Sequence, residues 1–211
     1  MKKIISYFTI FSSFLFLLSG CGNNNNLSNN KDENNNIEFS KTSITKDLTD
    51  ENSSKSAKET ELSTFSTPLK SGVQNRITNI KLTCNKINER VLKPGETFSF
   101  NEIVGPCTAE EGYKLAEIYV NKKISFALGG GNCQVSTTLY NSVLAVPGLE
   151  ITERHEHNGR PVDYIEDGKD ATVSYNTLDL KFVNNTGNDI KLYAWCDDVN
   201  VYAKINQITY E

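Results

Sequence analysis

The residue types best suited to chemistry are a cysteine behind a run of glycines and the two histidines of the chain. Cys133 follows the run Gly129-Gly130-Gly131-Asn132, and both histidines come later in the sequence. A thiol becomes an effective nucleophile when a base takes its proton and an acid orients that base. The candidate members of such a triad are Cys133 as nucleophile, His157 as base and Asp170 as orienting acid, with His155 and Asp179 as alternates.

A helix that begins at the glycine run would make the Cys133 thiol acidic. Apolar residues recur at helical spacing from Val135 to Val143, and Pro147-Gly148 ends the pattern. Asn132 is the predicted N-cap, which places Cys133 in the first turn. The positive end of the helix dipole and the unpaired amides of that turn both favour a thiolate.

A strand predicted over 149–157 would carry both histidines toward that helix. Its odd positions hold two apolar residues and, farther on, His155 and His157. Glu153 shares this face, which a wholly buried face would not favour. We expect both imidazoles on the inward side, next to the helix that begins at Cys133.

The glycine run also predicts a binding surface. Consecutive glycines permit positive φ and the close approach of another backbone or of a ligand. A glycan or a peptide backbone could lie there, against the polar residues that follow. The candidate binding residues are Gly129, Gly130, Gly131, Gln134, Ser136 and Thr137.

Hydrophobic periodicity predicts the remaining elements. These are a helix over 75–89, a short strand over 97–100, one or two strands over 115–128, antiparallel strands over 171–175, 178–182, 190–196 and 199–205, and a hairpin turn at 184–188. The predicted fold class is α+β, with an N-terminal helix, a glycine-rich loop leading into a central helix, and a mostly antiparallel sheet. The order of glycine loop, cysteine helix and histidine strand is similar to that of papain-like and transglutaminase-like folds.

The N-terminus has the pattern of a bacterial lipoprotein signal. A short basic start precedes an apolar stretch over 4–18 that is too short for a comfortable membrane span. The stretch ends in Leu18-Ser19-Gly20-Cys21, where small residues suit cleavage directly before the cysteine. We expect 1–20 to be the signal peptide and Cys21 to carry lipid. The protein would then be extracytoplasmic and anchored to the cell membrane.

Composition divides the rest of the chain into two parts. Residues 21–72 are rich in Asn, Ser, Thr, Lys and Glu and poor in apolar side chains, so they predict a disordered tether. Residues 73–211 are long enough for one domain with a hydrophobic core. A net charge of −4 without a basic stripe argues against nucleic acid as a partner.

The cysteines outside the anchor leave disulfide pairing open. Their even number permits two disulfides in an exported protein, but their spacing indicates no particular pairs. They are Cys84, Cys107, Cys133 and Cys196. The sequence contains no CxxC pair, phosphate-binding glycine loop, HExxH or GxSxG motif, and we expect no cofactor.

A set of short segments in fixed order carries a family resemblance. The segments are Pro94-Gly95-Glu96-Thr97-Phe98-Ser99-Phe100-Asn101, Gly105-Pro106, Gly112-Tyr113, 129–139, Glu153-Arg154-His155-Glu156-His157, Tyr164, 168–173 and 179–185. Over about 76–195 the chain resembles the VanW-like domain, which occurs in a glycopeptide-resistance accessory protein and in Gram-positive surface proteins. Cys107 departs from the pattern, because a basic or polar residue is expected after Gly-Pro. The resemblance implies a cell-envelope context and no particular reaction.

Three functions fit these residues. The first, slightly favoured, is a non-catalytic module that binds or scaffolds peptidoglycan or its precursors. The second is a cysteine-dependent acyl transferase or hydrolase that uses Cys133, His157 and Asp170. The third is a metal site formed by Cys133, His155 and His157, because a His-x-His pair is a common ligand spacing. The sequence leaves the choice between enzyme and non-enzyme open.

Overall fold

The computed structural model describes residues 56–120, 123–157 and 161–211. The helices are α1 (Gln74–Ile87), α2 (Phe100–Val104) and α3 (Asn132–Leu144). The strands are β1 (Ala57–Pro68), β2 (Arg90–Leu92), β3 (Thr97–Ser99), β4 (Leu115–Val120), β5 (Lys123–Leu128), β6 (Leu149–Glu153), β7 (Lys181–Asn184), β8 (Asp189–Cys196) and β9 (Asn200–Tyr210).

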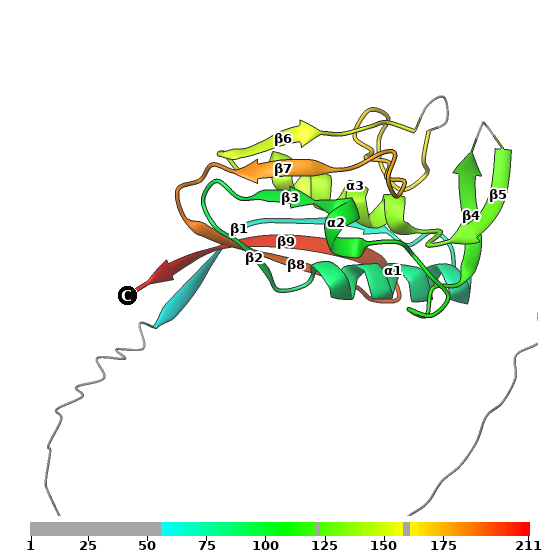
Figure 1. Ribbon diagram of the computed structural model, residues 1–211, viewed down its shortest axis with the longest axis horizontal. Helices are drawn as coiled ribbons and strands as arrows, with labels where there is room; N and C mark the ends of the chain where they lie inside the picture. The colour runs from blue at the N-terminus through cyan, green and yellow to red at the C-terminus, as the bar shows by residue number, and fades with distance from the viewer. Residues whose placement is uncertain (1–55, 121–122, 158–160) are drawn as a thin grey trace, which may run out of the picture. The chain divides into compact units, whose positions relative to one another are not determined.

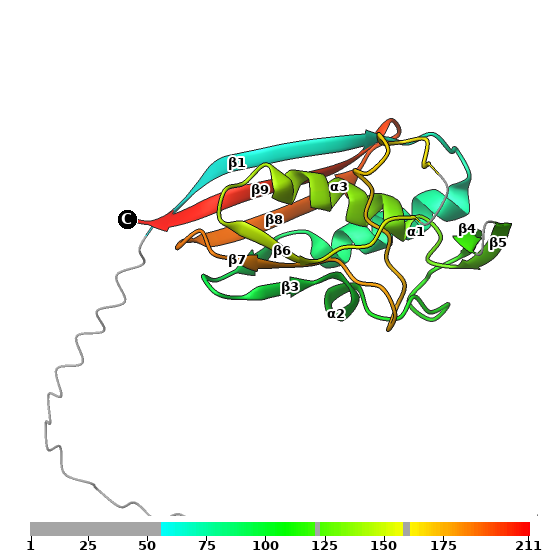
Figure 2. The same ribbon diagram turned by 90° about the horizontal axis from the view of Figure 1, so that it is seen from above.

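These elements form an α+β fold, as predicted, with antiparallel pairing in every sheet. One sheet has the strand order β1-β9-β8-β2, a second has the order β3-β7-β6, and β4 pairs with β5. Helix α3 lies between the first two sheets and contacts β9, β1 and β6 (Figure 1). Helix α1 packs beside it against β8 (Figure 2). The glycine-rich loop therefore leads into a central helix.

The core fills the space between the helices and the two larger sheets. Val135, Leu139 and Val143 of α3 are fully or almost fully buried, which is the stripe that helical spacing predicts. Phe98 of β3 stacks on Phe182 of β7 with ring centroids 4.8 Å apart. Each such buried side chain contributes about 1.5–3 kcal/mol relative to an exposed one, so the core fixes the position of α3 between the sheets.

The domain begins earlier than the sequence predicts. The predicted tether extends to residue 72, but β1 already pairs with β9 along its length. Two of its inward residues are Ser63 and Thr67, whose hydroxyls hydrogen-bond to Ser142 and Thr138 of α3. Because these inward positions are polar, hydrophobic alternation does not reveal the strand. The predicted signal peptide, Cys21 and the rest of the tether lie outside the described residues.

The segments around the predicted histidine strand also differ from the prediction. The strand predicted over 149–157 ends as β6 at Glu153, and 171–175 is irregular apart from one bridge between Ser174 and Leu178. The reason is that the backbone of Ala171 hydrogen-bonds to side chains of α3 instead of a neighbouring strand. The predicted hairpin turn at 184–188 connects β7 to β8, which belong to different sheets.

Strands β4 and β5 form a hairpin within the predicted 115–128 segment. The hairpin extends from the end of the domain at which α3 begins (Figure 1). Within the described ranges, no helix has the length and apolar character that crossing a bilayer requires.

Candidate active site

Cys133 lies in the first turn of α3, as predicted, but the cap differs. The N-cap is Gly131, with φ of 119°, and Asn132 is already helical. The Asn132 side chain is used elsewhere: its Oδ1 accepts from the Thr83 hydroxyl at 2.7 Å, and its Nδ2 donates to the Cys107 sulfur at 3.0 Å. The prediction of Asn132 as N-cap is therefore wrong, because its amide ties the loop to neighbouring segments.

The glycine run brings the start of α3 against its neighbours. A Cβ on Gly130 would lie 2.7 Å from the Glu117 carbonyl oxygen, which is backbone that cannot swing aside. A Cβ on Gly131 would lie 2.8 Å from Ile80. Gly129 has φ of +81°, a conformation that side chains disfavour. All three glycines are buried, so packing within the domain accounts for them.

His157 pairs closely with Asp170. Its Nδ1 lies 2.6 Å from Asp170 Oδ2, and its backbone N–H donates to the same oxygen at 2.6 Å. Both side chains are about nine-tenths buried, at 11% and 10% exposure. A carboxylate that accepts from Nδ1 leaves the other ring nitrogen free to exchange a proton with a thiol.

The Cys133 thiol lies near His157, and the two groups shift each other's pKa. Burial raises the pKa of Cys133, but a side-chain hydrogen bond and the charge of His157 outweigh it and lower the pKa below its ordinary value. Burial lowers the pKa of His157, but Cys133 and Asp170 outweigh it and raise that pKa. Both directions favour a thiolate–imidazolium pair.

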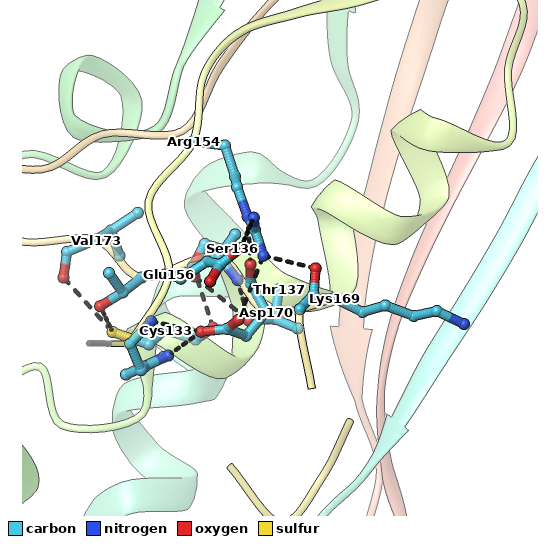
Figure 3. Close-up of polar contacts among 12 residues, drawn as sticks. Cys133, Ser136, Thr137, Arg154, Glu156, Lys169, Asp170 and Val173 are labelled. Carbon is cyan, nitrogen blue, oxygen red and sulfur yellow. Dashed lines mark hydrogen bonds and ion pairs between the residues drawn. The ribbon is translucent and has the colours of Figure 1, made fainter. Parts of the chain in front are cut away.

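Two further groups contact the sulfur from the irregular segment after Asp170. The Cys133 sulfur lies 3.4 Å from the Thr172 hydroxyl and 3.5 Å from the Val173 carbonyl oxygen (Figure 3). The hydroxyl stabilises a thiolate, and the carbonyl accepts from a neutral thiol. The stretch 170–173 thus supplies both the acid of the candidate triad and the hydrogen-bonding partners of the Cys133 sulfur.

The acid itself is held in its ionised form. Burial raises the pKa of Asp170, but hydrogen bonds from the His157 backbone and ring, together with the charges of His157 and Arg154, lower it below its ordinary value. The structure therefore brings Cys133, His157 and Asp170 together as one chain of contacts.

The alternates His155 and Asp179 lie in a separate cluster. His155 Nε2 is 2.9 Å from Glu153 Oε1, and the same carboxylate accepts from the Asp179 amide. Asp179 binds the Ser99 hydroxyl at 2.6 Å and the Asn101 amide at 2.9 Å, so it supports the start of α2. The Lys181 ammonium and His155 lower the pKa of Glu153 to about 2. The two imidazoles do not share a face, because β6 ends before them.

The candidate binding side chains form hydrogen bonds to other residues inside the domain. Gln134 accepts from Arg76 at 2.8 Å and donates to Thr67 and the Pro68 carbonyl. Ser136 donates to the Ala171 carbonyl at 2.6 Å, and the Thr137 hydroxyl accepts from the Ala171 amide at 2.9 Å. Both hydroxyls are fully buried. They hold the Asp170 segment against α3 and are not presented to a ligand.

The described residues contain no group of three or more His, Cys, Asp or Glu side chains placed to bind a metal ion. Cys133, His155 and His157 thus do not converge on a metal position. Cys84, Cys107, Cys133 and Cys196 are all free thiols, with Cys84 buried and the other three partly exposed.

The family resemblance includes Tyr164 but assigns it no role, and no sequence pattern predicts a cavity next to His157. Burial and the charge of Cys133 raise the pKa of Tyr164, and a hydrogen bond with Thr137 partly offsets this. A cavity of about 200 Å³ opens beside His157 and Asp170, with Pro161 and Val162 in its lining. Both features depend on residues of 154–157 and 161–170, where the described backbone forms no helix or strand that periodicity could place.

Comparison with known proteins identifies the domain. Residues 75–206 match the family described as VanW like protein. An uncharacterized protein of Bacillus subtilis, YoaR, is 42% identical over 134 residues, which are 64% of this chain and 44% of the relative. The vancomycin B-type resistance protein VanW of Enterococcus faecalis is 33% identical over 137 residues, which are 63% of this chain and 49% of the relative.

The chain therefore matches less than half the length of each of these relatives. No solved structure matches it, so the predicted likeness to papain-like and transglutaminase-like folds stays a prediction. The family match covers more than half of the chain, and its bounds enclose every residue of the candidate site. The chain belongs to the VanW-like family.

Proposed function

We propose that this protein is a cysteine-dependent enzyme that transfers or hydrolyses acyl groups, with Cys133 as its nucleophile. The observation that carries the proposal is the grouping of Cys133, His157 and Asp170, in which His157 Nδ1 lies 2.6 Å from Asp170 and the imidazole lowers the pKa of the nearby thiol. Nucleophile, base and orienting acid in this order are the arrangement of cysteine acyl transfer. A purely structural cysteine needs neither of the other two groups.

The proposed reaction uses groups at defined atoms. His157 takes the thiol proton, and the Cys133 thiolate attacks a carbonyl carbon to form a tetrahedral intermediate. The imidazolium then donates that proton to the leaving group as the carbonyl re-forms, which leaves a thioester on Cys133. Water or an amine, deprotonated by His157, attacks the thioester and releases the thiol.

The start of α3 suits the charge that develops in this reaction. Amides in the first helical turn have no preceding helical carbonyl to bond, and they lie at the positive end of the dipole. The first turn of α3 contains no acidic residue and no side-chain cap. The Cys133 amide is the proposed donor to the oxyanion.

The non-catalytic binding module receives less support from the site. Its candidate side chains Gln134, Ser136 and Thr137 are buried and bonded within the domain. The glycines are explained by packing against Glu117 and Ile80. The side chains that suggested a ligand surface are therefore buried and bonded within the domain, whereas the Cys133 thiol and the His157 ring are partly exposed.

We place this activity at the cell envelope, with a lipid on Cys21 as the membrane anchor. The lipoprotein-like N-terminus and the envelope context implied by the family support this location. Peptidoglycan or its precursors are the proposed acyl donors, because a tethered domain outside the membrane meets their amide bonds first. One relative is named for vancomycin B-type resistance, which is compatible with such substrates.

The test is acylation of the full chain by p-nitrophenyl acetate, followed by peptide mass analysis. We expect a burst of nitrophenolate equal to one site and an acetyl group on Cys133. Cys133→Ser should abolish the burst. Cys107→Ser is the matched control, because Cys107 is also partly exposed and lies beside the same loop. Acetylation spread over several cysteines, or a burst that survives Cys133→Ser, would overturn the proposal.

A further inference from the structure

We infer that Arg154 is a positioning residue that holds Asp170 in the orientation required by His157. The inference rests on the proposed function of the Cys133–His157–Asp170 chain. Arg154 is not one of these three residues, and it follows directly after the last residue of β6. Its side chain is 17% exposed, which is unusual for a group that always carries charge.

The guanidinium binds Asp170 at two places. Its Nε donates to the Asp170 backbone carbonyl at 2.6 Å, and its Nη2 donates to Asp170 Oδ1 at 3.3 Å. The other carboxylate oxygen, Oδ2, accepts from His157. One oxygen of Asp170 therefore faces Arg154 and the other faces the imidazole, so the carboxylate cannot rotate without losing a contact.

Other contacts fix the guanidinium in turn. Nη2 also donates to the Gly168 carbonyl at 2.8 Å, and Nη1 pairs with Glu156 at 2.6 Å. The guanidinium lies over the Tyr140 ring of α3, 5.1 Å from its centroid. Figure 3 shows Arg154 extending toward Asp170, with Glu156 nearby. Arg154 thus connects the end of β6, the 168–170 segment and the helix that carries Cys133.

A lysine could not replace this set of contacts. Arginine presents five donors in a rigid planar fork, whereas an ammonium is a single flexible point of charge. The Nε and Nη2 donors reach a backbone carbonyl and a carboxylate oxygen of the same residue. Lysine would keep the positive charge near Asp170 but lose these two hydrogen bonds. The substitution therefore distinguishes the effect of the charge at position 154 from the effect of its hydrogen bonds on the orientation of Asp170.

The experiment measures iodoacetamide alkylation of Cys133 against pH in the full chain, read by peptide mass analysis. The charged or titratable groups around the measured thiol are His157, Asp170, Arg154, Glu156 and the neutral phenol of Tyr164. With Arg154→Lys, Asp170 no longer holds the imidazolium in place, and we expect the Cys133 pKa to rise by on the order of one unit. Alkylation below that pKa then slows about tenfold. Arg90→Lys, at an exposed position of β2, is the matched control and should match the wild type.

A double-variant comparison shows whether Arg154 acts through Asp170. In an Asp170→Asn background, Arg154→Lys should produce no further change in the Cys133 pKa. If Arg154→Lys does not fold, Tyr140→Leu removes the ring beneath the guanidinium and should shift the Cys133 pKa in the same direction by a smaller amount. An unchanged alkylation profile in the folded variant would overturn the positioning role.

The two proposals fail in different ways. A wild-type Cys133 that titrates at its ordinary value would overturn the nucleophile itself. An acidic wild-type Cys133 combined with an unchanged Arg154→Lys profile would overturn the role of Arg154 alone. A further shift from Arg154→Lys in the Asp170→Asn background would show that Arg154 acts by a route other than Asp170.

Discussion

Asp170 and Asp179 are both buried carboxylates, yet the structure gives them different partners. Asp170 binds the ring and amide of His157, so its charge stabilises an imidazolium next to the thiol. Asp179 binds the Ser99 hydroxyl and the Asn101 amide, so its charge stabilises the start of α2. Asparagine at position 170 should therefore change the reactivity of the Cys133 thiol, whereas asparagine at position 179 should change the stability of the domain.

Asp170→Asn removes the negative charge beside His157. The His157 pKa should fall, and the Cys133 thiolate should lose its charged partner, so the Cys133 pKa should rise. Alkylation at a fixed pH below that pKa should slow about tenfold for each unit of rise. The measurement is the rate of Cys133 alkylation at neutral pH.

Asp179→Asn is the matched variant. It should leave the alkylation rate close to that of the wild type and lower the free energy of unfolding by about 1–3 kcal/mol, because the Ser99 hydroxyl and the Asn101 amide lose a charged acceptor. Urea unfolding measures this loss. Equal effects of the two variants on alkylation would contradict the assignment of Asp170 as the orienting acid.

At this scale the sequence named candidate residues but could not place them in space. Cys133, His157 and Asp170 were the candidates because of their types and order, with His155 and Asp179 as alternates. Strand alternation placed both histidines on one face. The choice depends on where β6 ends, and a β-strand boundary is among the least certain features of sequence-based assignment.

The element that positions the thiol is α3, and its start depends on the glycine run. Gly130→Ala would place a Cβ 2.7 Å from the Glu117 carbonyl oxygen and 2.8 Å from Ala116. Because these atoms are backbone, β4 or the loop must shift, and we expect a loss of about 1–3 kcal/mol in the free energy of unfolding. Urea unfolding of the variant measures the loss.

Gly72→Ala is the control for this prediction. A Cβ on Gly72 meets nothing within 4 Å, so stability should stay within about 0.5 kcal/mol of the wild type. A Gly130→Ala variant as stable as Gly72→Ala would show that the close approach of β4 to the loop does not constrain the start of α3.

Of the described helices, α1 and α3 were predictable, because Ile80, Ile87, Leu139 and Val143 recur at helical spacing, and these four side chains are buried. The segment that carries Arg154, His157 and Asp170 was not. Its described residues, 154–157 and 161–170, form no helix or strand, and the amide of the next residue, Ala171, bonds to the Thr137 side chain of α3. Periodicity reports regular elements, so an active-site loop held by side-chain hydrogen bonds leaves no such signal.

On the scale of the whole molecule, β1 joins the N-terminal end of the domain to its last strand and to α3. Thr67 of β1 is fully buried and bonds to Thr138 and Gln134, both in the helix that begins near Cys133. The strand was missed because its inward positions include hydroxyl side chains, which resemble the polar composition of the segment before it.

Thr67→Val tests this long-range contact. It removes the hydroxyl that meets Thr138 and Gln134, and we expect the free energy of unfolding to fall by about 1–2 kcal/mol. Thr64→Val, at an exposed position of the same strand, should change it by less than about 0.5 kcal/mol. Equal midpoints for the two variants in urea would show that β1 is not an integral part of the domain.

The most direct test of the account as a whole is the pH dependence of Cys133 alkylation in the full chain, with and without His157. Only the thiolate reacts, so a lowered pKa extends the reaction to lower pH. We predict that Cys133 titrates well below the ordinary cysteine value of about 8.5. His157→Gln removes the imidazolium and should raise that pKa toward the ordinary value. A Cys133 that titrates near 8.5 in the wild type, or that is unchanged by His157→Gln, would contradict the assignment of Cys133 and His157 as nucleophile and base.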